Sequence, residues 1–244
     1  WNMGWMNDIL EYTELDPIFR KDHHHHLTFS ITYAFSENYV LPFSHDEVVH
    51  GKKSLLNKMP GTYEEKFAGL RLLFLYQYSH PGKKLLFMGG EFGQFIEWNE
   101  WQELDWFLLD YTKHAQIQTY VKELNQFYTK EPALYEQDHC YDGFQWVEHE
   151  NQEESIIVFE RLDKQGESVI VALNFTPVAR KNYPIGVKRE GSYRTVFHTD
   201  KQRYGGSLKR VKTFKSIPKQ HHGKPFLVEI ELPPLGGLIL QYKK

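Results

Sequence analysis

The stretch LPFSHDEVVHGKKS, residues 41–54, brings acids, histidines and lysines together around a short apolar run. Its HDEVVH string is close to the H-E-x-x-H pattern, in which two histidines four residues apart hold zinc from one face of a helix. Here His45 and His50 are five residues apart, and at about 100° per residue they would diverge by roughly 140° around a helix. The spacing therefore argues against a zinc site.

The two adjacent acids suggest carbohydrate chemistry instead. Carboxylates stabilise the oxocarbenium-like transition state of glycosyl transfer. If residues 41–47 are extended, Asp46 and Glu47 point to opposite sides of the strand, so at most one of them faces a sugar. Asp46, with His45 beside it, would then lie at the carboxyl end of a strand, where barrel enzymes place catalytic groups. The same residues could instead cap the following turn, and the spacing alone leaves both interpretations open.

The elements that would position this cluster follow the order strand, loop, helix. Thr62 and Glu65 form a Thr-x-x-Glu capping box before KFAGLRLLFLYQYS, whose apolar spacing predicts a helix with one strongly buried face that ends at the Pro-Gly pair 81–82. The run KLLFM at 84–88 is too short for a helix and predicts a buried strand that opens into GGEFG. A second helix is predicted over 113–130. This order implies parallel strands with crossover helices.

The second half of the sequence changes character. Polar or Gly/Pro turns separate short segments that are β-branched or alternate apolar with polar residues, namely SIIVFERLD, SVIVALNFTP, YRTVFHTD, FLVEIELPP and GGLILQYK. This pattern is typical of an antiparallel β-sandwich. The predicted fold class is therefore α/β followed by all-β, with a first domain over 1–134 and a C-terminal all-β domain over 135–244.

Composition narrows the classes of function. The chain has 244 residues, a net charge of −3 and no long Lys/Arg block that would indicate a nucleic-acid partner. No run approaches the roughly 18 apolar residues of a membrane helix, and the start WNMGWMND lacks the regions of a signal peptide. The single Cys140 cannot form an internal disulfide, which favours a reducing compartment. We therefore predict a cytoplasmic protein without a nucleic-acid or membrane partner.

The stretch at 41–54 also closely resembles the strand-seven region of the α-amylase superfamily, in the form typical of 1,4-α-glucan branching enzymes. Further motifs of that family occur along the chain, namely WNMGWMNDILEY, HHHHLTFS, PGKKLLFMGGEFGQ, EWN followed by LDWFLLD, YDGFQW, NFTP and YGGS. The resemblance implies a retaining enzyme with a (β/α)8 barrel and a C-terminal β-domain. It implies cleavage of an α-1,4 bond in a glucan such as glycogen and transfer of the released segment to a 6-hydroxyl, with α-glucan as partner, no cofactor and no metal.

The resemblance also assigns roles by position. Asp46 is similar to the family's third catalytic carboxylate, which hydrogen-bonds sugar hydroxyls and helps to stabilise the transition state. His45 resembles the histidine that contacts the same glucosyl unit. Glu47 is a motif member predicted to take part in substrate binding without an assigned step. Glu91 and Trp98 are predicted to line the cleft near strand eight, with packing inside their loop as the alternative.

Tryptophans are candidate stacking surfaces for glucose rings, because such surfaces help a sugar hydroxyl to compete with water for the glycosyl intermediate. The candidates are Trp1, Trp5, Trp98, Trp101 and Trp106. Trp5 is included with Trp98 among the predicted substrate-binding residues. The alternative for each of them is a place in the core, which is the commoner role of a buried tryptophan.

Two other catalytic groups of the superfamily do not occur in this sequence. The nucleophilic aspartate belongs to a G-F-R-x-D segment, which is absent, and the general acid belongs to an E-E-S segment. The EES at 153–155 follows Asp46 instead of preceding it and opens a strand of the β-domain, so we exclude it as the acid. The family pattern puts both groups upstream of Trp1. We therefore expect a C-terminal piece that is inactive alone and whose partner is the N-terminal part of the same protein.

Two other functions stay open. One is hydrolysis by an α-amylase-like or trehalose-forming member of the superfamily, although LPFSHDEVVHGKKS and MGGEFGQ favour a branching enzyme. The other is a non-catalytic glucan-binding module, in which the β-domain contacts glycogen and the barrel part supports it.

Overall fold

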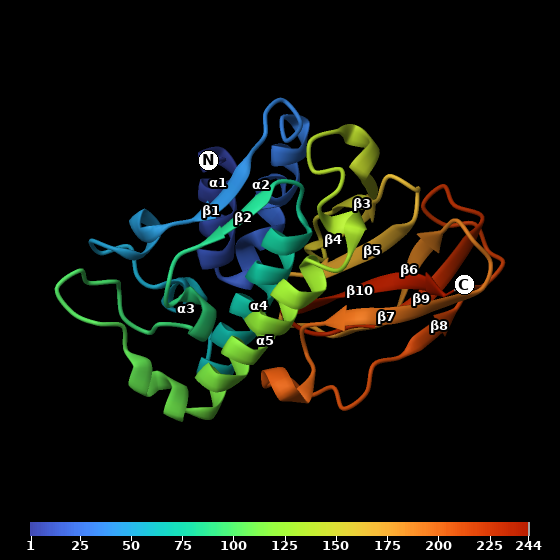
Figure 1. Cartoon of the computed structure of the whole chain (residues 1–244). Coiled ribbons are helices and arrows are strands. Elements are labelled where there is room, and N and C mark those ends of the chain that lie inside the picture. Colours follow the sequence, from blue (N-terminus) through green and yellow to red (C-terminus); the bar gives the residue numbers. More distant parts are fainter. Residues whose placement is uncertain (244) are drawn as a thin grey trace.

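The computed structural model describes residues 1–243, with a mixed helical part first and strands after it (Figure 1). The helices are α1 (Met3–Glu14), α2 (His25–Thr28), α3 (Leu55–Lys58), α4 (Tyr63–Ser79) and α5 (Thr112–Tyr128). The strands are β1 (Val40–Phe43), β2 (Lys83–Leu86), β3 (Phe144–Asn151), β4 (Ile156–Leu162), β5 (Ser168–Asn174), β6 (Arg180–Val187), β7 (Ser192–His198), β8 (Thr213–Lys215), β9 (Phe226–Leu232) and β10 (Gly236–Lys243). Within residues 1–243, no helix has the length and apolar character needed to cross a membrane.

β1 and β2 form a parallel sheet, and α4 is the crossover between them (Figure 1). The predicted capping box begins this helix. The Glu65 amide donates to Thr62 Oγ1 at 3.3 Å, and the Thr62 amide donates to the Glu65 carboxylate at 2.7 Å. These two reciprocal bonds satisfy amides that a helix N-terminus otherwise leaves unpaired. The predicted strand, loop and helix order and the parallel pairing are confirmed.

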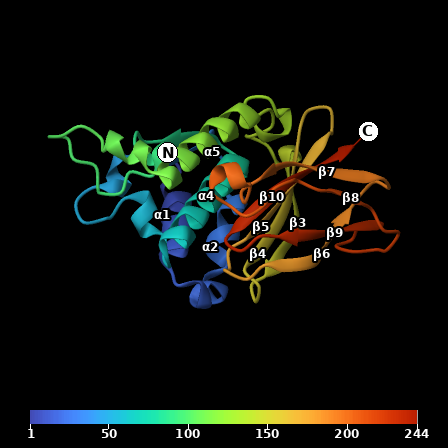
Figure 2. The same ribbon diagram turned by 90° about the horizontal axis from the view of Figure 1, so that it is seen from below.

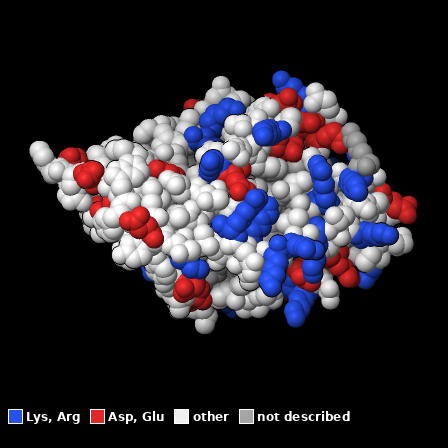
Figure 3. Space-filling model, turned by 60° about the horizontal axis from the view of Figure 1, so that its bottom comes forward, with Lys and Arg blue, Asp and Glu red and all other residues white. Residues whose placement is uncertain are grey.

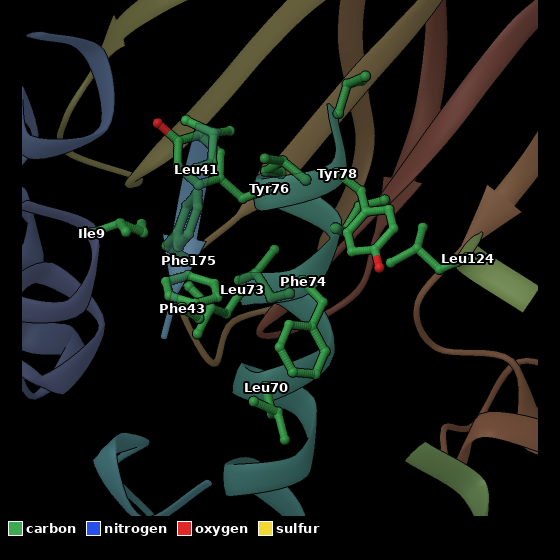
Figure 4. Close-up of a cluster of buried hydrophobic side chains, with 14 of the residues drawn as sticks. Ile9, Leu41, Phe43, Leu70, Leu73, Phe74, Tyr76, Tyr78, Leu124 and Phe175 are labelled. Atoms are coloured by element: carbon green, nitrogen blue, oxygen red, sulfur yellow. The ribbon is translucent and has the colours of Figure 1, made fainter. Parts of the chain in front are cut away.

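The sequence predicted one buried face for α4, and the structure differs. Every residue from Gly69 to Ser79 is buried. Side chains of β1 lie on one side of the helix (Figure 4), while α5, β5 and β10 pack against other sides. A helix enclosed by two layers needs apolar contacts all round, so its pattern cannot be that of a surface helix.

The second part is an antiparallel sandwich, as predicted. Its larger sheet has the order β3-β4-β5-β10-β7-β8, and β6 pairs with β9 in a smaller sheet. A separate core of mainly aliphatic side chains, including Val158, Ile185 and Ile230, lies between the two sheets. Figure 2 shows the helices gathered at one side of the molecule and these strands at the other. The fold class, α/β followed by all-β, is confirmed.

A continuous core joins the two parts. It contains Trp5 and Phe74 of the first part together with Val171 and Ile239 of the second. Because α4 packs directly on β5 and β10, the two parts share buried surface instead of a linker. The domain boundary predicted at residue 134 falls between α5 and β3, where the chain has only short helical turns, and it stays a prediction.

Candidate functional site

The candidate site lies where the two parallel strands end. β1 ends at Phe43, whose carbonyl accepts a hydrogen bond from Phe87 N at 2.8 Å, so the pairing of β1 and β2 continues one step past the strands. His45 and Asp46 follow immediately and are both exposed. The carboxyl ends of parallel strands meet at one edge, which is the edge where α/β folds place ligands.

The turn that presents this pair is built by its neighbours. Ser44 caps a short 3-10 helix over His45–Val48, and its hydroxyl accepts a hydrogen bond from Asp46 N at 3.3 Å. The Glu47 carboxylate turns back and accepts a hydrogen bond from Ser44 N. Glu47 is only 5% exposed, so its carboxylate stabilises the turn and does not face solvent. This is the capping role that the sequence left open, and it falls to Glu47 rather than to Asp46.

The separation of Asp46 from Glu47 has a different cause from the one predicted. An extended backbone over 41–47 would place them on opposite faces, but extension ends at Phe43. The 3-10 helix rotates by about 120° per residue, which turns Asp46 outward while Glu47 points into the turn. Only one of the two acids is therefore available to a ligand, as the sequence indicated.

His45 and Asp46 form an exposed pair of neighbouring side chains. His45 Nε2 lies 3.4 Å from Asp46 Oδ1, and the side chains are 48% and 60% exposed. Such a pair offers a hydrogen-bond acceptor and an imidazole to the same small volume outside the strand ends. Both groups are therefore open to a ligand that approaches the strand ends.

Two aromatic side chains, Phe87 and Trp98, lie beside the pair. The His45 ring centroid is 5.9 Å from that of Phe87 and 6.0 Å from that of Trp98, and Phe87 and Trp98 are 5.1 Å apart at 80°. Trp98 N also donates to the Val48 carbonyl at 2.9 Å, which ties the Trp98 loop to the turn after β1. The structure thus brings Trp98 to the predicted pair.

Glu91 lies in the glycine loop after β2 and is partly buried. Its carboxylate accepts a hydrogen bond from Gly89 N at 2.7 Å and so closes the loop on itself. Gly89 has φ of +90°, a conformation that side chains with a Cβ rarely adopt, which explains the glycine there. Packing within the loop, the alternative given for Glu91, describes its main contact.

Glu97 is a member of this region that sequence reasoning missed. Its carboxylate accepts hydrogen bonds from Gly51 N at 2.9 Å and Lys53 N at 2.7 Å, and these bonds lower the pKa of the Glu97 carboxyl. It thereby holds the loop after β1, where His50 and Lys53 have φ of +53° and +65°. An open hollow of about 700 Å³ lies between this loop and the Trp98 loop. No local motif links residues 46 positions apart, so the sequence carried no signal for this contact.

Trp5 is placed differently from the other predicted residues. It is fully buried, and its ring packs 5.3 Å from Phe43 and 6.0 Å from Tyr76 between ring centroids. It supports β1 from inside the core and presents no face on which a glucose ring could stack. The core role, which was the alternative for each tryptophan, describes its contacts.

The remaining sequence candidates lie elsewhere. The EES at 153–155 forms the turn between β3 and β4, where the Glu154 carboxylate lies 3.1 Å from Arg180 NH1. In the histidine run, His24 is buried and its Nε2 is 3.0 Å from the His149 carbonyl. Within residues 1–243, no group of three or more His, Cys, Asp or Glu side chains is arranged to hold a metal ion.

Comparison with known proteins first identifies the β-domain and the fold. Residues 146–243 match the family model described as Alpha amylase, C-terminal all-beta domain. The fold agrees over the whole chain. The alpha-amylase from H. orenii superposes with a TM-score of 0.59 at 11% identity over 99% of this chain and 48% of its own. The pullulanase type I from Bacillus subtilis superposes with a TM-score of 0.67 at 13% identity over 100% of this chain and 35% of its own.

The sequence is much more similar to 1,4-alpha-glucan branching enzymes. The 1,4-alpha-glucan branching enzyme GlgB of Halothermothrix orenii is 56% identical over 243 residues, which is 99% of this chain and 39% of that protein. The enzyme of the same name from Aquifex aeolicus is 54% identical over 100% of this chain and 39% of its own length. The chain thus spans about 39% of the length of these relatives. The predicted resemblance to branching enzymes of the α-amylase superfamily is confirmed.

Proposed function

We propose that this chain forms part of a 1,4-α-glucan branching enzyme and supplies one side of its glucan site. The observation that carries the proposal is the identity of more than half of all positions over essentially the whole chain, 56% over 243 residues. The exposed His45 and Asp46 pair at the strand ends supports it, because this is the place where a barrel enzyme would bind substrate.

Asp46 is the residue that we propose to act on the transition state. Cleavage of the α-1,4 bond builds positive charge on the sugar ring, and a carboxylate that accepts hydrogen bonds from its hydroxyls stabilises that charge. His45, whose Nε2 lies 3.4 Å from Asp46 Oδ1, would contact the same ring. We propose that a nucleophile and a general acid outside these residues form and break the glycosyl bonds, since no G-F-R-x-D segment occurs here.

Transfer in place of hydrolysis is the distinctive part of the proposal. In transfer, a 6-hydroxyl of a glucan chain attacks the glycosyl-enzyme intermediate. The hydroxyl oxygen bonds to the sugar, the bond between sugar and nucleophile breaks, and the hydroxyl proton passes to the acid/base residue. Trp98 and Phe87 supply apolar surface beside the pair, on which an acceptor ring can lie while water is displaced. We therefore assign Trp98 to glucan binding and the Glu91 loop to a supporting position beside it. Trp5 and Glu47 are buried, so we do not assign them contacts with the glucan.

The domain assignment belongs to the same proposal. We propose that residues 1–134 are the C-terminal portion of a catalytic (β/α)8 barrel and that residues 135–244 are the β-domain that packs on it. The parallel pair β1 and β2 with its crossover α4 supports the first part, and the direct packing of α4 on β5 and β10 supports the second. The cytoplasm stays the expected compartment, since the single Cys140 favours reducing conditions.

The test uses the intact protein that contains this sequence, with linear amylose as substrate. A branching enzyme lowers the iodine colour and yields short chains after enzymatic debranching, without new reducing ends. A hydrolase releases reducing ends in step with the loss of colour, and a glucan-binding module retains amylose without either change. Only the first result agrees with the proposal.

Two variants sharpen this test. Asp46→Asn is expected to lower the branching rate about 100-fold to 1,000-fold, the usual effect of removing one group that stabilises transition-state charge. Asp110→Asn is a matched control, an exposed acid in the same half of the molecule and outside the strand edge. A polypeptide of residues 1–244 alone is expected to show no branching. Full activity of Asp46→Asn, or activity of residues 1–244 alone, would contradict the assignment.

A further inference from the structure

The Trp98 loop, residues 95–103, has no regular structure of its own. Its sequence, FIEWNEWQE, lies between the glycine loop after β2 and a short helical turn that begins at Trp106, and it belongs to no helix or strand. In Figure 1 it is part of the green loop that projects from the helical part, away from the β-domain. Its position therefore depends on bonds to other segments of the chain.

Ion pairs do not hold this loop. It contains Glu97, Glu100 and Glu103 and no Lys or Arg. Within residues 1–243, none of these three acids forms an ion pair. Figure 3 shows Asp and Glu, without Lys or Arg beside them, near the tapered end of the molecule. Because like charges repel, the loop needs hydrogen bonds to stay in place.

Part of this hydrogen bonding uses the backbone of the loop. The Phe95 carbonyl accepts from Ser54 Oγ at 2.8 Å and from Asn57 Nδ2 at 2.6 Å. Trp98 N donates to the Val48 carbonyl at 2.9 Å. These bonds all reach the segment that follows β1, so the Trp98 loop is fastened to the segment that presents the candidate site.

Glu97 adds two bonds to the same segment, at its least favourable backbone. Its Oε2 accepts from Gly51 N at 2.9 Å and its Oε1 from Lys53 N at 2.7 Å. His50 and Lys53 have φ of +53° and +65°, a left-handed conformation that persists in such residues only where the surroundings hold it. Backbone amides that converge in this way form a concavity for an anion, and the Glu97 carboxylate occupies it.

The aromatic side of the candidate site begins at the next residue. Trp98 is partly buried, and its ring centroid lies 6.0 Å from that of His45 and 5.1 Å from that of Phe87. Two successive residues are thus fixed to the segment after β1, Glu97 through its carboxylate and Trp98 through its amide. Without the carboxylate, the amide bond alone would hold Trp98 there, and the ring would be free to leave His45.

The position of Trp98 bears on which group attacks the glycosyl-enzyme intermediate. Attack by a glucan 6-hydroxyl makes a branch, whereas attack by water makes a reducing end. In both reactions the attacking oxygen bonds to the sugar, the bond between sugar and nucleophile breaks, and a proton passes to the acid/base residue. An aromatic ring that orients the acceptor and excludes water favours the first reaction.

We propose that Glu97 is a positioning residue, which holds Trp98 beside His45 and thereby favours transfer of the glucan segment over its hydrolysis. Both oxygens of its carboxylate already accept bonds from the backbone, so Glu97 acts through Trp98 and not on the sugar. The inference rests on the proposed branching activity and names a residue that directs the outcome of that reaction.

The test counts the new reducing ends and the new branches that the intact protein makes from amylose. Glu97→Ala removes both hydrogen bonds and is expected to raise the number of reducing ends per branch about fivefold, the typical effect of one lost aromatic contact. Glu97→Gln keeps one acceptor oxygen, but its amide group faces a backbone N–H, so a smaller increase is expected. Glu103→Gln is the matched control, an exposed acid of the same loop, and is expected to keep the wild-type ratio.

A double variant shows whether Glu97 acts through Trp98. Trp98→Ala alone is expected to raise the ratio of reducing ends to branches about fivefold as well. Adding Glu97→Ala to Trp98→Ala is then expected to change nothing further, whereas independent effects would multiply to about 25-fold. The melting temperature of each variant is expected to stay within about 2 °C of the wild-type value, because the substitutions release only an exposed loop.

Three results would overturn the inference and leave the branching activity intact. The first is an unchanged ratio of reducing ends to branches in Glu97→Ala. The second is a multiplied effect in the double variant, since Glu97 would then act independently of Trp98. The third is a lower melting temperature of Glu97→Ala with an unchanged ratio, which would limit Glu97 to a role in folding. A wild-type protein that makes no branches would instead overturn the branching proposal, and this inference with it.

Discussion

Two pairs of an acidic and a basic side chain lie in opposite settings in this molecule. His45 and Asp46 lie 3.4 Å apart at the strand edge, with both side chains about half exposed. Arg161 and Asp138 lie 2.8 Å apart at the junction of the two parts, with both side chains fully buried. Burial decides what a charge pair can do, because water screens an exposed pair and leaves it free to exchange partners.

The buried pair is surrounded by further bonds. Arg161 also donates to the carbonyls of Ser79 and Gly143, at 2.8 Å and 3.0 Å. Burial alone would raise the pKa of Asp138, but the positive charges of Lys84 and Arg161 outweigh it and hold that pKa below its usual value. Arg161 thereby joins the end of α4 to β4 and fixes the two parts to each other. The exposed pair makes no such connection, which is what a ligand-binding pair requires.

The largest expected effect comes from breaking the buried pair. Asp138→Ala leaves the Arg161 charge buried without compensation and is expected to cost about 3–5 kcal/mol of unfolding free energy. Urea unfolding followed by circular dichroism measures it. Glu153→Ala is the matched control, because it breaks the exposed pair with Lys21, and it is expected to cost less than about 1 kcal/mol. Equal losses of unfolding free energy for Asp138→Ala and Glu153→Ala would contradict the difference between the buried and the exposed pair.

The second effect is a loss of folding stability at low pH, caused by His80, which is buried near the same junction. Desolvation lowers the pKa of His80 to about 3, and its ring nitrogens contact Ser30 Oγ and the Pro81 carbonyl, both at 2.9 Å. Between that pKa and the ordinary value of about 6.5, the unfolded chain binds a proton that the folded chain does not. Stability therefore falls as pH drops through this window, by about 2 kcal/mol for His80 between pH 7 and pH 5.

Urea midpoints at both pH values measure this loss. His80→Gln removes the titrating group, so its variant is expected to lose less stability on acidification than the wild-type protein. A pH dependence unchanged by the substitution would mean that His80 is not a source of the acid sensitivity.

A third effect separates the two tryptophans that the sequence treated alike. Trp98→Ala is expected to raise KM for amylose about fivefold, roughly 1 kcal/mol of lost stacking, with little change in melting temperature. Trp5→Phe is expected to lower the melting temperature and leave KM unchanged, because Trp5 is enclosed by Phe43 and Tyr76. A lower melting temperature for Trp98→Ala together with a raised KM for Trp5→Phe would contradict these roles.

The smallest expected effect completes the comparison. Asp46→Asn is expected to change the unfolding free energy by less than about 0.5 kcal/mol, since an exposed pair contributes little to stability. The same substitution is expected to abolish most of the activity. A large loss of stability in the urea titration would show that Asp46 holds the turn after β1, and its catalytic assignment would then lose its basis.

Much of the fold could be predicted from local pattern. Capping at Thr62 and Glu65 placed the start of α4, and five alternating or β-branched runs correspond to β4, β5, β7, β9 and β10. β3, β6 and β8 were not predicted. β8 has three residues, and β6 contains Pro184 and a positive φ at Asn182, so neither has the regular alternation that identifies a strand.

The candidate site was predicted in part. The sequence singled out His45 and Asp46, and the structure places them together, exposed, at the strand ends. Only the resemblance separated the catalytic Asp46 from Glu47, because spacing alone does not show the direction that the turn gives to each of two adjacent acids. The sequence could not place Glu97, whose contacts lie 44 and 46 residues away in the chain.

By itself, the sequence determined the two long helices α4 and α5, the strands β1 and β2, five strands of the β-domain, the resemblance to branching enzymes, and the acid and histidine available for chemistry. These properties depend on residue type and short-range spacing, which folding does not alter. The tertiary structure alone decided which charged and aromatic side chains face solvent. Exposure depends on which distant segments cover a residue, and so Asp46 is exposed and Trp98 half-buried while Asp138 and Trp5 are enclosed.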